Sequence, residues 1–216
     1  GLTALEKCMW DLVLGVVVIV VLAVAAFAGG LALARRVHKA LAGLAAVVVI
    51  LAAALYEVHL RDSVWLLRLL PFSNTIVLGN WAAIAAGFLA GLAWRLTPGS
   101  FLRRAWPVAG LAVAGGYVLV HPLLGSPPPC RDLWAAGNVC RQSSPATCSP
   151  ACAATLLARC GIQTTEQEMA RLCLTRDGTR WQGLYRGLKK KTADTGFRVE
   201  VFDCPVDRLS ELAPDR

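Results

Sequence analysis

Histidine and closely paired cysteines are scarce in this sequence. Only three of its 216 residues are histidine, the last at His121, and no two of its eight cysteines form a C-x-x-C pair. Structural zinc sites usually combine C-x-x-C pairs or cysteine with histidine, and c-type haem attachment needs C-x-x-C-H. Thiol oxidoreductases normally use C-x-x-C as well. We therefore expect no metal and no cofactor, and rank a thiol oxidoreductase last among the candidate functions.

Charge is also scarce, and it is unevenly distributed. Charged residues make up 17% of the chain and hydrophobic residues 56%, with a mean hydropathy of +0.54. This composition is too apolar for an ordinary soluble domain of this length. Charges are few before Gly125 and frequent after it. The sequence therefore predicts a membrane domain over residues 1–125 and a soluble domain over residues 126–216.

The formal net charge of +8 invites a nucleic-acid interpretation. Many of the basic residues, however, lie in short loops between apolar stretches, where membrane proteins place them. The run Lys189-Lys190-Lys191 is typical of a solvated helix end. No nucleic-acid-binding motif is present, so we expect no nucleic-acid partner.

Four apolar stretches are long enough to cross a bilayer, which takes about 20 helical residues. The first is not a signal peptide, because its apolar run is long and acidic residues precede it. A short amphipathic segment around Trp65 is expected at the membrane interface. Gly87 and Gly91 form a small-xxx-small pair on the third stretch. The predicted spans are Leu12–Ala34, Ala40–Tyr56, Ile76–Trp94 and Trp106–Leu124.

The loops predict the orientation of these spans. The loop between spans one and two and the loop between spans three and four carry most of the basic residues of the membrane part. The positive-inside rule places both loops in the cytoplasm. Both termini and the domain after Gly125 are then outside the cytoplasm, in a multi-pass protein of the cell membrane whose first partner is the lipid bilayer. The basic loop residues are Arg35, Arg36, Lys39, Arg95, Arg103 and Arg104.

Seven of the eight cysteines follow Gly125. An exported compartment permits disulfides, and small domains gain most from them. We expect three bridges of unspecified connectivity, which leave one thiol free unless Cys8 or a second chain takes it. The proline run of "GSPPPC" predicts an extended spacer that holds the domain off the bilayer.

The segment "CSPACAATLLARCG" predicts a helix that begins near Cys148 and stops at Gly161. A helix N-terminus favours the thiolate of Cys148, whereas Cys152 and Cys160 are expected to face inward. Thr165 and Glu168 predict a capping box for a second helix, and Thr179 a cap for a third. "FRVEVFD" alternates as a strand does, and "PVDRLSELA" predicts a short helix.

The ordered series Gln142, Cys148, "PAC", Gly161-Ile162, "EQEM" and "DGTRWQGL" resembles the papain-like bacteriocin-processing (double-glycine leader) peptidases, over about residues 140–203. The resemblance implies an α+β papain-like domain after the four-helix transmembrane region, with its helical front half present and most of its sheet beyond the chain end. It implies Cys148 as nucleophile and Gln142 as an oxyanion-hole donor.

The sequence departs from that family in two places. Ser149 stands where the family usually has glycine. The family's catalytic His and Asp, which lie well downstream of the nucleophile, are missing, since no histidine follows His121. His121 ends span four and is interpreted as an interfacial residue. We expect the 216 residues to be a segment of a longer protein; otherwise the domain is a non-catalytic relative.

Three functions follow from these observations. The first is a membrane-anchored cysteine peptidase that acts outside the cytoplasm on a peptide or a neighbouring membrane protein. The second is an inactive, peptidase-like interaction module of a membrane complex, and the third is the thiol oxidoreductase already ranked last. Double-glycine specificity is not expected, because the predicted topology is opposite to that of the family.

Overall fold

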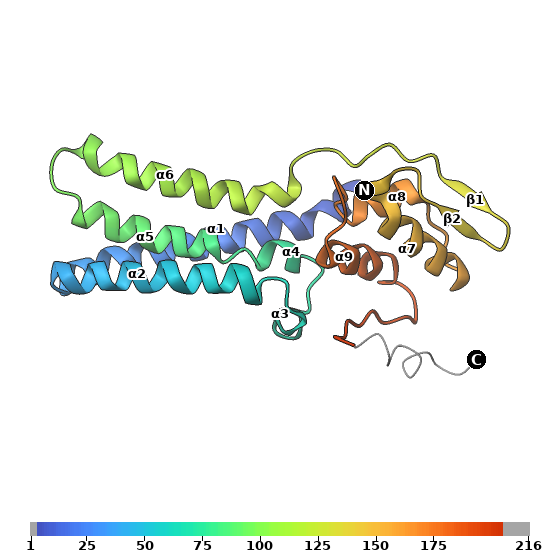
Figure 1. Cartoon of the computed structure of the whole chain (residues 1–216), viewed down its shortest axis with the longest axis horizontal. Coiled ribbons are helices and arrows are strands. Elements are labelled where there is room, and N and C mark those ends of the chain that lie inside the picture. The colour runs from blue at the N-terminus through green and yellow to red at the C-terminus, as the bar shows by residue number, and fades with distance from the viewer. Residues whose placement is uncertain (1–3, 205–216) are drawn as a thin grey trace.

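The structure, a computed structural model, describes residues 4–204 as a bundle of long helices joined to a smaller domain (Figure 1). Its long helices are α1 (Ala4–Arg36), α2 (Lys39–Leu55), α5 (Ala82–Leu96) and α6 (Phe101–Val120). A π-helical turn, Tyr56–Leu60, extends α2, and a 3-10 turn, His121–Leu123, extends α6. Two short helices, α3 (Val64–Leu69) and α4 (Thr75–Leu78), connect α2 to α5.

Four of these helical segments are long and apolar enough to cross a membrane, which confirms the predicted number of spans. They cover Met9–Arg36, Lys39–Leu60, Thr75–Leu96 and Phe101–Leu123. Their side chains point largely outward, as expected of helices whose solvent is hydrocarbon. The protein is therefore a multi-pass membrane protein, and the short interfacial segment predicted around Trp65 forms the α3 helix.

Close backbone contact holds α1 against α5. A Cβ added at Gly87 would lie 2.3 Å from the Ala23 carbonyl oxygen, and one at Gly91 would lie 2.1 Å from the Phe27 carbonyl oxygen. Only glycine permits this approach, and lipid-embedded helices associate mainly through such packing. The small-residue pair predicted on span three is thus a true helix contact.

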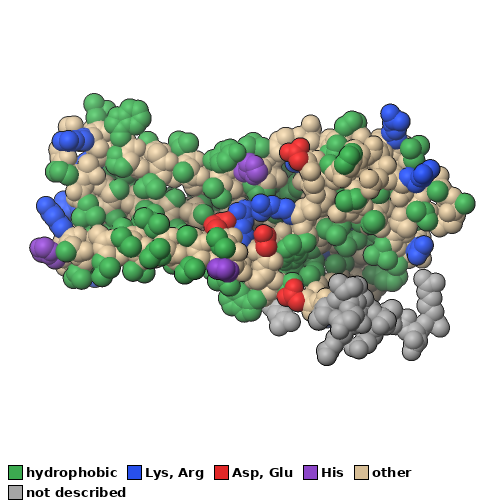
Figure 2. Space-filling model, in the orientation of Figure 1, with side chains coloured by type: hydrophobic (Ala, Val, Ile, Leu, Met, Phe, Trp, Pro, Cys, Tyr) green, Lys and Arg blue, Asp and Glu red, His purple; other side chains and the backbone are tan. Residues whose placement is uncertain are grey.

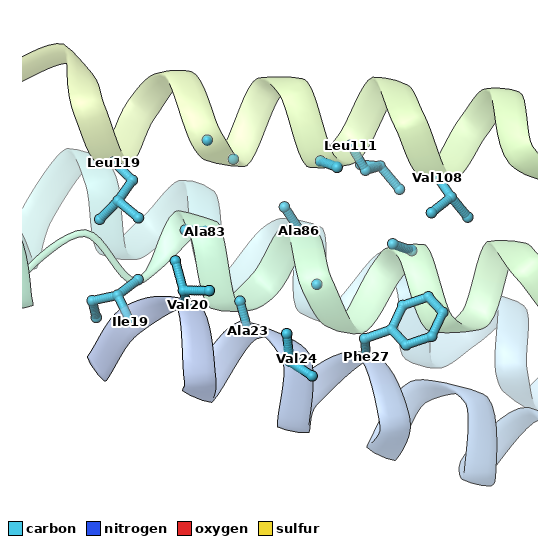
Figure 3. A pocket seen from close by; sticks show the side chains of 15 residues that line it. Ile19, Val20, Ala23, Val24, Phe27, Ala83, Ala86, Val108, Leu111 and Leu119 are labelled. Carbon is cyan, nitrogen blue, oxygen red and sulfur yellow. The ribbon is translucent and has the colours of Figure 1, made fainter. Parts of the chain in front are cut away.

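Helix α6 packs on α5 and stays apart from α1, which leaves an apolar groove of about 290 Å³. Figure 3 shows side chains of α1, among them Ile19 and Phe27, directed towards Leu111 and Leu119 of α6 across this groove. All lining residues belong to the candidate spans. The apolar wall suits the hydrocarbon of a bilayer.

The two basic loops lie together at one end of the bundle, and the smaller domain lies at the other end (Figure 1). Basic side chains gather at the loop end in the space-filling view, while the flank of the bundle is largely hydrophobic (Figure 2). This arrangement matches the alternation of loops that the sequence predicts for four consecutive spans.

The smaller domain begins with an antiparallel hairpin of β1 (Leu133–Ala135) and β2 (Val139–Arg141), in which Trp134 pairs with Cys140. Gly137 and Asn138 turn it with φ of +79° and +56°, values that glycine and asparagine tolerate best. Three helices follow, α7 (Cys148–Arg159), α8 (Glu166–Leu172) and α9 (Trp181–Lys191). They confirm the three helices predicted after Cys148.

The domain core lies between these helices and the hairpin. Ala154 and Met169 are fully buried, and Leu157 and Cys173 are almost so. Helix α9 fits closely against the end of α8, because a Cβ at Gly183 would lie 2.1 Å from the Cys173 carbonyl oxygen. Half-buried leucines at positions 172, 184 and 188 complete the packing.

Four local predictions were wrong. Residues 197–203 are in no strand, because no other strand of residues 4–204 lies beside them to complete a hydrogen-bonded ladder. The cap of α9 is Arg180 rather than Thr179, whose hydroxyl is 2.7 Å from that of Thr175. Cys152 is exposed on α7 rather than inward-facing. The cysteines from Cys130 to Cys204 are free thiols rather than bridged.

The remaining predictions for this half of the chain have mixed outcomes. The structure shows a small hairpin with helices and no papain-like sheet among the described residues. The helix expected over 205–213 lies outside the described residues. The proline run does form an extended connection, but it does not hold the domain off the bundle, because the domain docks directly on the helix ends.

Docking depends on Asp11 of α1. The Arg186 guanidinium of α9 donates to both carboxylate oxygens of Asp11, at 3.1 and 3.2 Å, and is itself only 1% exposed. Lys190 lies 3.2 Å from the same carboxylate. The Ser73 hydroxyl also donates to Asp11, at 3.0 Å. The Asp11 carboxylate of the first span therefore binds both α9 of the domain and the loop before α4.

A second set of contacts joins α9 to the segment between α2 and α4. The Gln182 side-chain amide donates to Asp62 at 2.8 Å, and the Lys189 ammonium donates to the Pro71 carbonyl. Figure 2 shows charged side chains of both signs gathered at this junction. Together with Asp11, these contacts fix the domain against the end of the bundle.

Candidate active site at Cys148

The candidate nucleophile Cys148 is the first residue of α7 and follows a short 3-10 turn, Pro145–Thr147. Ser144 caps this turn: its N–H donates to the Thr147 hydroxyl at 3.0 Å, and that hydroxyl donates back to the Ser144 carbonyl at 2.9 Å. Thr147 is fully buried. The residue before the thiol is therefore anchored, and Cys148 is held at the start of a 12-residue helix.

Glu166 anchors the other half of this loop. Its carboxylate is fully buried and accepts from the Ser143 N–H at 2.7 Å and from the Ser143 hydroxyl at 2.5 Å. The Ser143 hydroxyl accepts in turn from the Arg131 N–H at 2.7 Å. A buried carboxylate that receives such bonds makes a strong, directional anchor. Glu166 thus ties the residue after Gln142 to α8.

Helix α7 is also tied to the hairpin. The Thr155 hydroxyl accepts from the Cys140 N–H at 2.9 Å and donates to the Ala151 carbonyl at 2.9 Å. Behind it, Ala151 and Ala154 are buried in the core. The helix that carries the thiol therefore cannot turn about its axis without breaking core contacts.

The thiol of Cys148 itself is exposed. Its one hydrogen-bonding neighbour among residues 4–204 is the Ser149 hydroxyl, at 3.9 Å from the sulfur. The backbone N–H groups of the first turn of α7 lie at the same helix end, where the helix dipole favours negative charge. A thiolate and a developing oxyanion are both species that such an end stabilises.

Gln142 is exposed and lies between β2 and the capped turn. In the described part of the chain its amide makes no hydrogen bond to Cys148, so the structure places the two residues on one loop without joining them. His121 lies elsewhere: it lines a cavity with Cys173 and Arg176 at the end of α6. It therefore does not act as a base for Cys148 in this arrangement.

The other thiols differ from Cys148 in their surroundings. Burial, together with the carboxylates of Glu166 and Asp132, raises the pKa of Cys140 to about 11. Burial and the same two carboxylates raise the pKa of Cys130 to about 11. Burial raises the pKa of Cys173 to about 12, although the Arg186 charge and the Gly187 backbone act in the opposite direction. Because the thiolate is the reactive form, these three thiols are poor nucleophiles at neutral pH.

Sequence reasoning missed the supporting residues of this site. Glu166 entered only as part of the family resemblance, and its position as first residue of α8, just after the predicted cap Thr165, indicates a surface carboxylate rather than a buried anchor. The sequence around Thr155 indicates a residue on the helix surface. Neither role can be found without knowing that the loop 142–147 folds onto α8 and that β2 lies beside α7.

No protein-family model matches the sequence, and no curated protein or solved structure matches it. The function is therefore argued from the site itself.

Proposed function

We propose that this chain is a membrane-anchored cysteine peptidase that acts on a peptide or a neighbouring membrane protein outside the cytoplasm. Cys148 is the nucleophile: its sulfur attacks a peptide carbonyl carbon to give a tetrahedral adduct, and the proton of the thiol passes to the nitrogen of the scissile bond. The adduct then collapses: the C–N bond breaks, the amine leaves, and a thioester remains on the cysteine. Water hydrolyses the thioester to a carboxylic acid and the free thiol. The Gln142 amide and the first N–H groups of α7 stabilise the tetrahedral oxyanion.

The observation that supports this proposal most is the contrast between Cys148 and the buried thiols of the domain. Cys148 is the exposed first residue of a rigidly held helix, whereas Cys140 and Cys173 are buried with raised pKa values. Loops that are anchored on a scaffold and present an exposed reactive side chain are typical of catalytic positions. The order of Gln142 and Cys148 on one loop agrees with the resemblance to papain-like peptidases.

The proposed location outside the cytoplasm rests on the basic loops. They lie at the end of the bundle opposite the domain (Figure 1), and such loops are retained in the cytoplasm. The thiols of the domain then face a compartment in which disulfides form.

A second candidate is an interaction module that binds a peptide segment without cleaving it. The absence of an imidazole or carboxylate hydrogen-bonded to the Cys148 thiol, within residues 4–204, favours it. A general base within hydrogen-bond reach is what distinguishes a peptidase site from a binding site.

Peptide cleavage by membranes that contain the protein separates the two candidates. Wild type and Cys152→Ser should cleave a peptide library equally, Cys148→Ser should be inactive, and Gln142→Ala should lose about 10²–10³-fold in kcat, the usual cost of removing one oxyanion donor. Cys152 is the matched control because it is an exposed cysteine of the same helix. Cleavage that survives in Cys148→Ser would refute the peptidase assignment, and binding without cleavage in the wild type would establish the interaction module.

A further inference from the structure

A cavity of about 360 Å³ lies where the domain meets the outer ends of two spans. The spans contribute Ile76, at the start of the third candidate span, together with His121 and Pro122 at the end of the fourth. The domain contributes the segment between α8 and α9. The volume of the cavity falls within the usual range for sites that bind small molecules. The residues of the domain that line it are Cys173, Leu174, Arg176, Asp177, Gly178, Thr179 and Arg180.

The height of this cavity relative to a bilayer follows from the spans. Apolar spans end where hydrocarbon gives way to headgroups, and Ile76 and Leu123 are close to such ends. Tyr117, one turn before His121, is exposed and stacks obliquely against it with ring centroids 5.3 Å apart. Exposed tyrosine is enriched at this level of membrane proteins. The cavity therefore lies among lipid headgroups.

Two arginines, Arg176 and Arg180, line the cavity, and they differ in how many of their donors are already hydrogen-bonded. Arg176 uses Nε to donate to the Leu124 carbonyl and Nη1 to donate to the Thr175 carbonyl, both at 2.8 Å. Its Nη2 makes no hydrogen bond in the described part of the chain. Burial lowers the pKa of Arg176, so an anion beside it would offset part of the cost of burying its charge.

Arg180 is the less constrained of the two. It is the N-cap residue of α9, and its side chain makes no hydrogen bond or ion pair within residues 4–204. Against the two arginines stands one acidic residue of the lining, Asp177, which likewise has no ion-pair partner there. With His121 neutral, the lining carries a net charge of +1.

We propose that this cavity binds the phosphate of an anionic phospholipid headgroup, with the Arg180 guanidinium and Nη2 of Arg176 as donors. Guanidinium groups match phosphate oxygens in shape and charge. A headgroup with one negative charge and no positive charge, such as that of phosphatidylglycerol, complements the net charge of the lining. The acyl chains of the lipid would extend alongside the outer ends of α4 and α6, where the surroundings are hydrocarbon.

The test is lipid binding by the full chain in detergent, followed by native mass spectrometry. Phosphatidylglycerol and phosphatidylcholine are titrated separately, and inorganic phosphate is added as a competitor. Arg180→Gln removes the unpaired donor, while Arg159→Gln is the matched control, since Arg159 is an exposed arginine at the end of α7 outside the cavity lining. Asp177→Asn removes the opposing charge.

We expect the wild type to retain one phosphatidylglycerol in preference to phosphatidylcholine. Arg180→Gln should weaken that binding about tenfold, as the loss of a charge-assisted hydrogen bond implies. Arg180→Lys should recover part of the binding, Arg159→Gln should leave it unchanged, and Asp177→Asn should strengthen it. Equal losses in Arg180→Gln and Arg159→Gln, or no preference between the lipids, would overturn the proposal. Displacement of the lipid by millimolar phosphate would instead identify a free-phosphate site and overturn the lipid assignment.

Discussion

Replacing Asp11 by alanine should release the domain from the membrane bundle. The Asp11 carboxylate accepts from Nε and Nη2 of the Arg186 guanidinium, and Arg186 is 1% exposed. Without it, the buried Arg186 guanidinium loses two of its hydrogen bonds and the carboxylate it contacts, while Ser73 loses an acceptor. Breaking a buried ion pair by removing one partner costs about 3–5 kcal/mol. Because Asp11 is itself 13% exposed, we expect a destabilisation near the lower bound of that range, about 3 kcal/mol.

Hydrogen exchange measures this change directly. Amides of α9 should exchange faster in Asp11→Ala than in the wild type, by roughly 100-fold if the lower bound of about 3 kcal/mol applies, since 1.36 kcal/mol corresponds to a factor of ten. Amides in the middle of α5 should keep their rates, because they belong to the bundle. Glu200→Ala is the control: its pair with Arg198 is 50% and 88% exposed, and exposed pairs of this kind contribute little.

A double mutant tests the ion pair between Asp11 and Arg186 even if the single variant folds poorly. In Asp11→Ala combined with Arg186→Met, the buried charge is also gone, and much of the protection of α9 should return. Equal exchange in Asp11→Ala and wild type would show that the ion pair does not hold the domain. Additive losses in the double mutant would show that Asp11 and Arg186 act separately.

Three further predictions concern the domain alone. Gly183→Ala should destabilise the domain by about 1–3 kcal/mol, because the new Cβ would lie 2.1 Å from the backbone oxygen of Cys173. Gly178→Ala is the control and should leave the stability unchanged, since the space around Gly178 is open. Equal midpoints of the two variants in thermal unfolding would contradict this prediction. The contribution of the Cys173 thiol to stability should be constant below pH 9 and fall as the pH rises towards 12, because the folded pKa of Cys173, about 12, lies above its ordinary value of 9.0 and the folded state holds the proton more tightly. Cys173→Ala should remove that part of the fall in denaturant titrations. Iodoacetamide at neutral pH should modify the exposed Cys148 and Cys152 before the buried Cys173. Early modification of Cys173, mapped by mass spectrometry, would refute the assigned burial.

The membrane half could be predicted almost completely from the sequence, because the signals there are strong and local. An apolar run longer than the bilayer is thick specifies a helix with little regard to its neighbours. The Gly87 and Gly91 pair also indicated a helix contact in advance, since no other residue allows two helix backbones to approach so closely. What could not be predicted was the partner, α1, because pairing of spans depends on geometry across the whole bundle.

In the domain, helices could be predicted and their tertiary contacts could not. Pro150, Gly161 and Thr165 mark the ends of α7 and α8 by local chemistry, and Thr165 does accept from the Glu168 N–H, at 3.1 Å. Residues 197–203 alternate as a strand does, yet a strand exists only with a neighbour to bond. Cys152 was expected inside because it lies one turn after Cys148, whereas the buried face of α7 consists of Pro150, Ala151, Ala153, Ala154 and Leu157.

The candidate site divides in the same way. Cys148 at a helix start could be predicted from Pro150 and the good helix formers after it. The buried carboxylate of Glu166, which fixes the loop before Cys148 from 23 residues away in the sequence, could not. Asp11 and Arg186 likewise lie 175 residues apart in sequence, and no local pattern links them.

The most direct test of the central claim is to ask whether a peptide can acylate Cys148. Membranes that contain the protein are incubated with a peptidyl electrophile that mimics the scissile carbonyl, and the adduct is mapped by mass spectrometry. We predict a peptidyl adduct on Cys148 alone, formed at least tenfold faster than with a simple alkylating agent of equal intrinsic reactivity, and slowed in Gln142→Ala. Equal labelling of Cys148 and the exposed control Cys152 would contradict the claim, since it would show accessible thiols rather than a catalytic one.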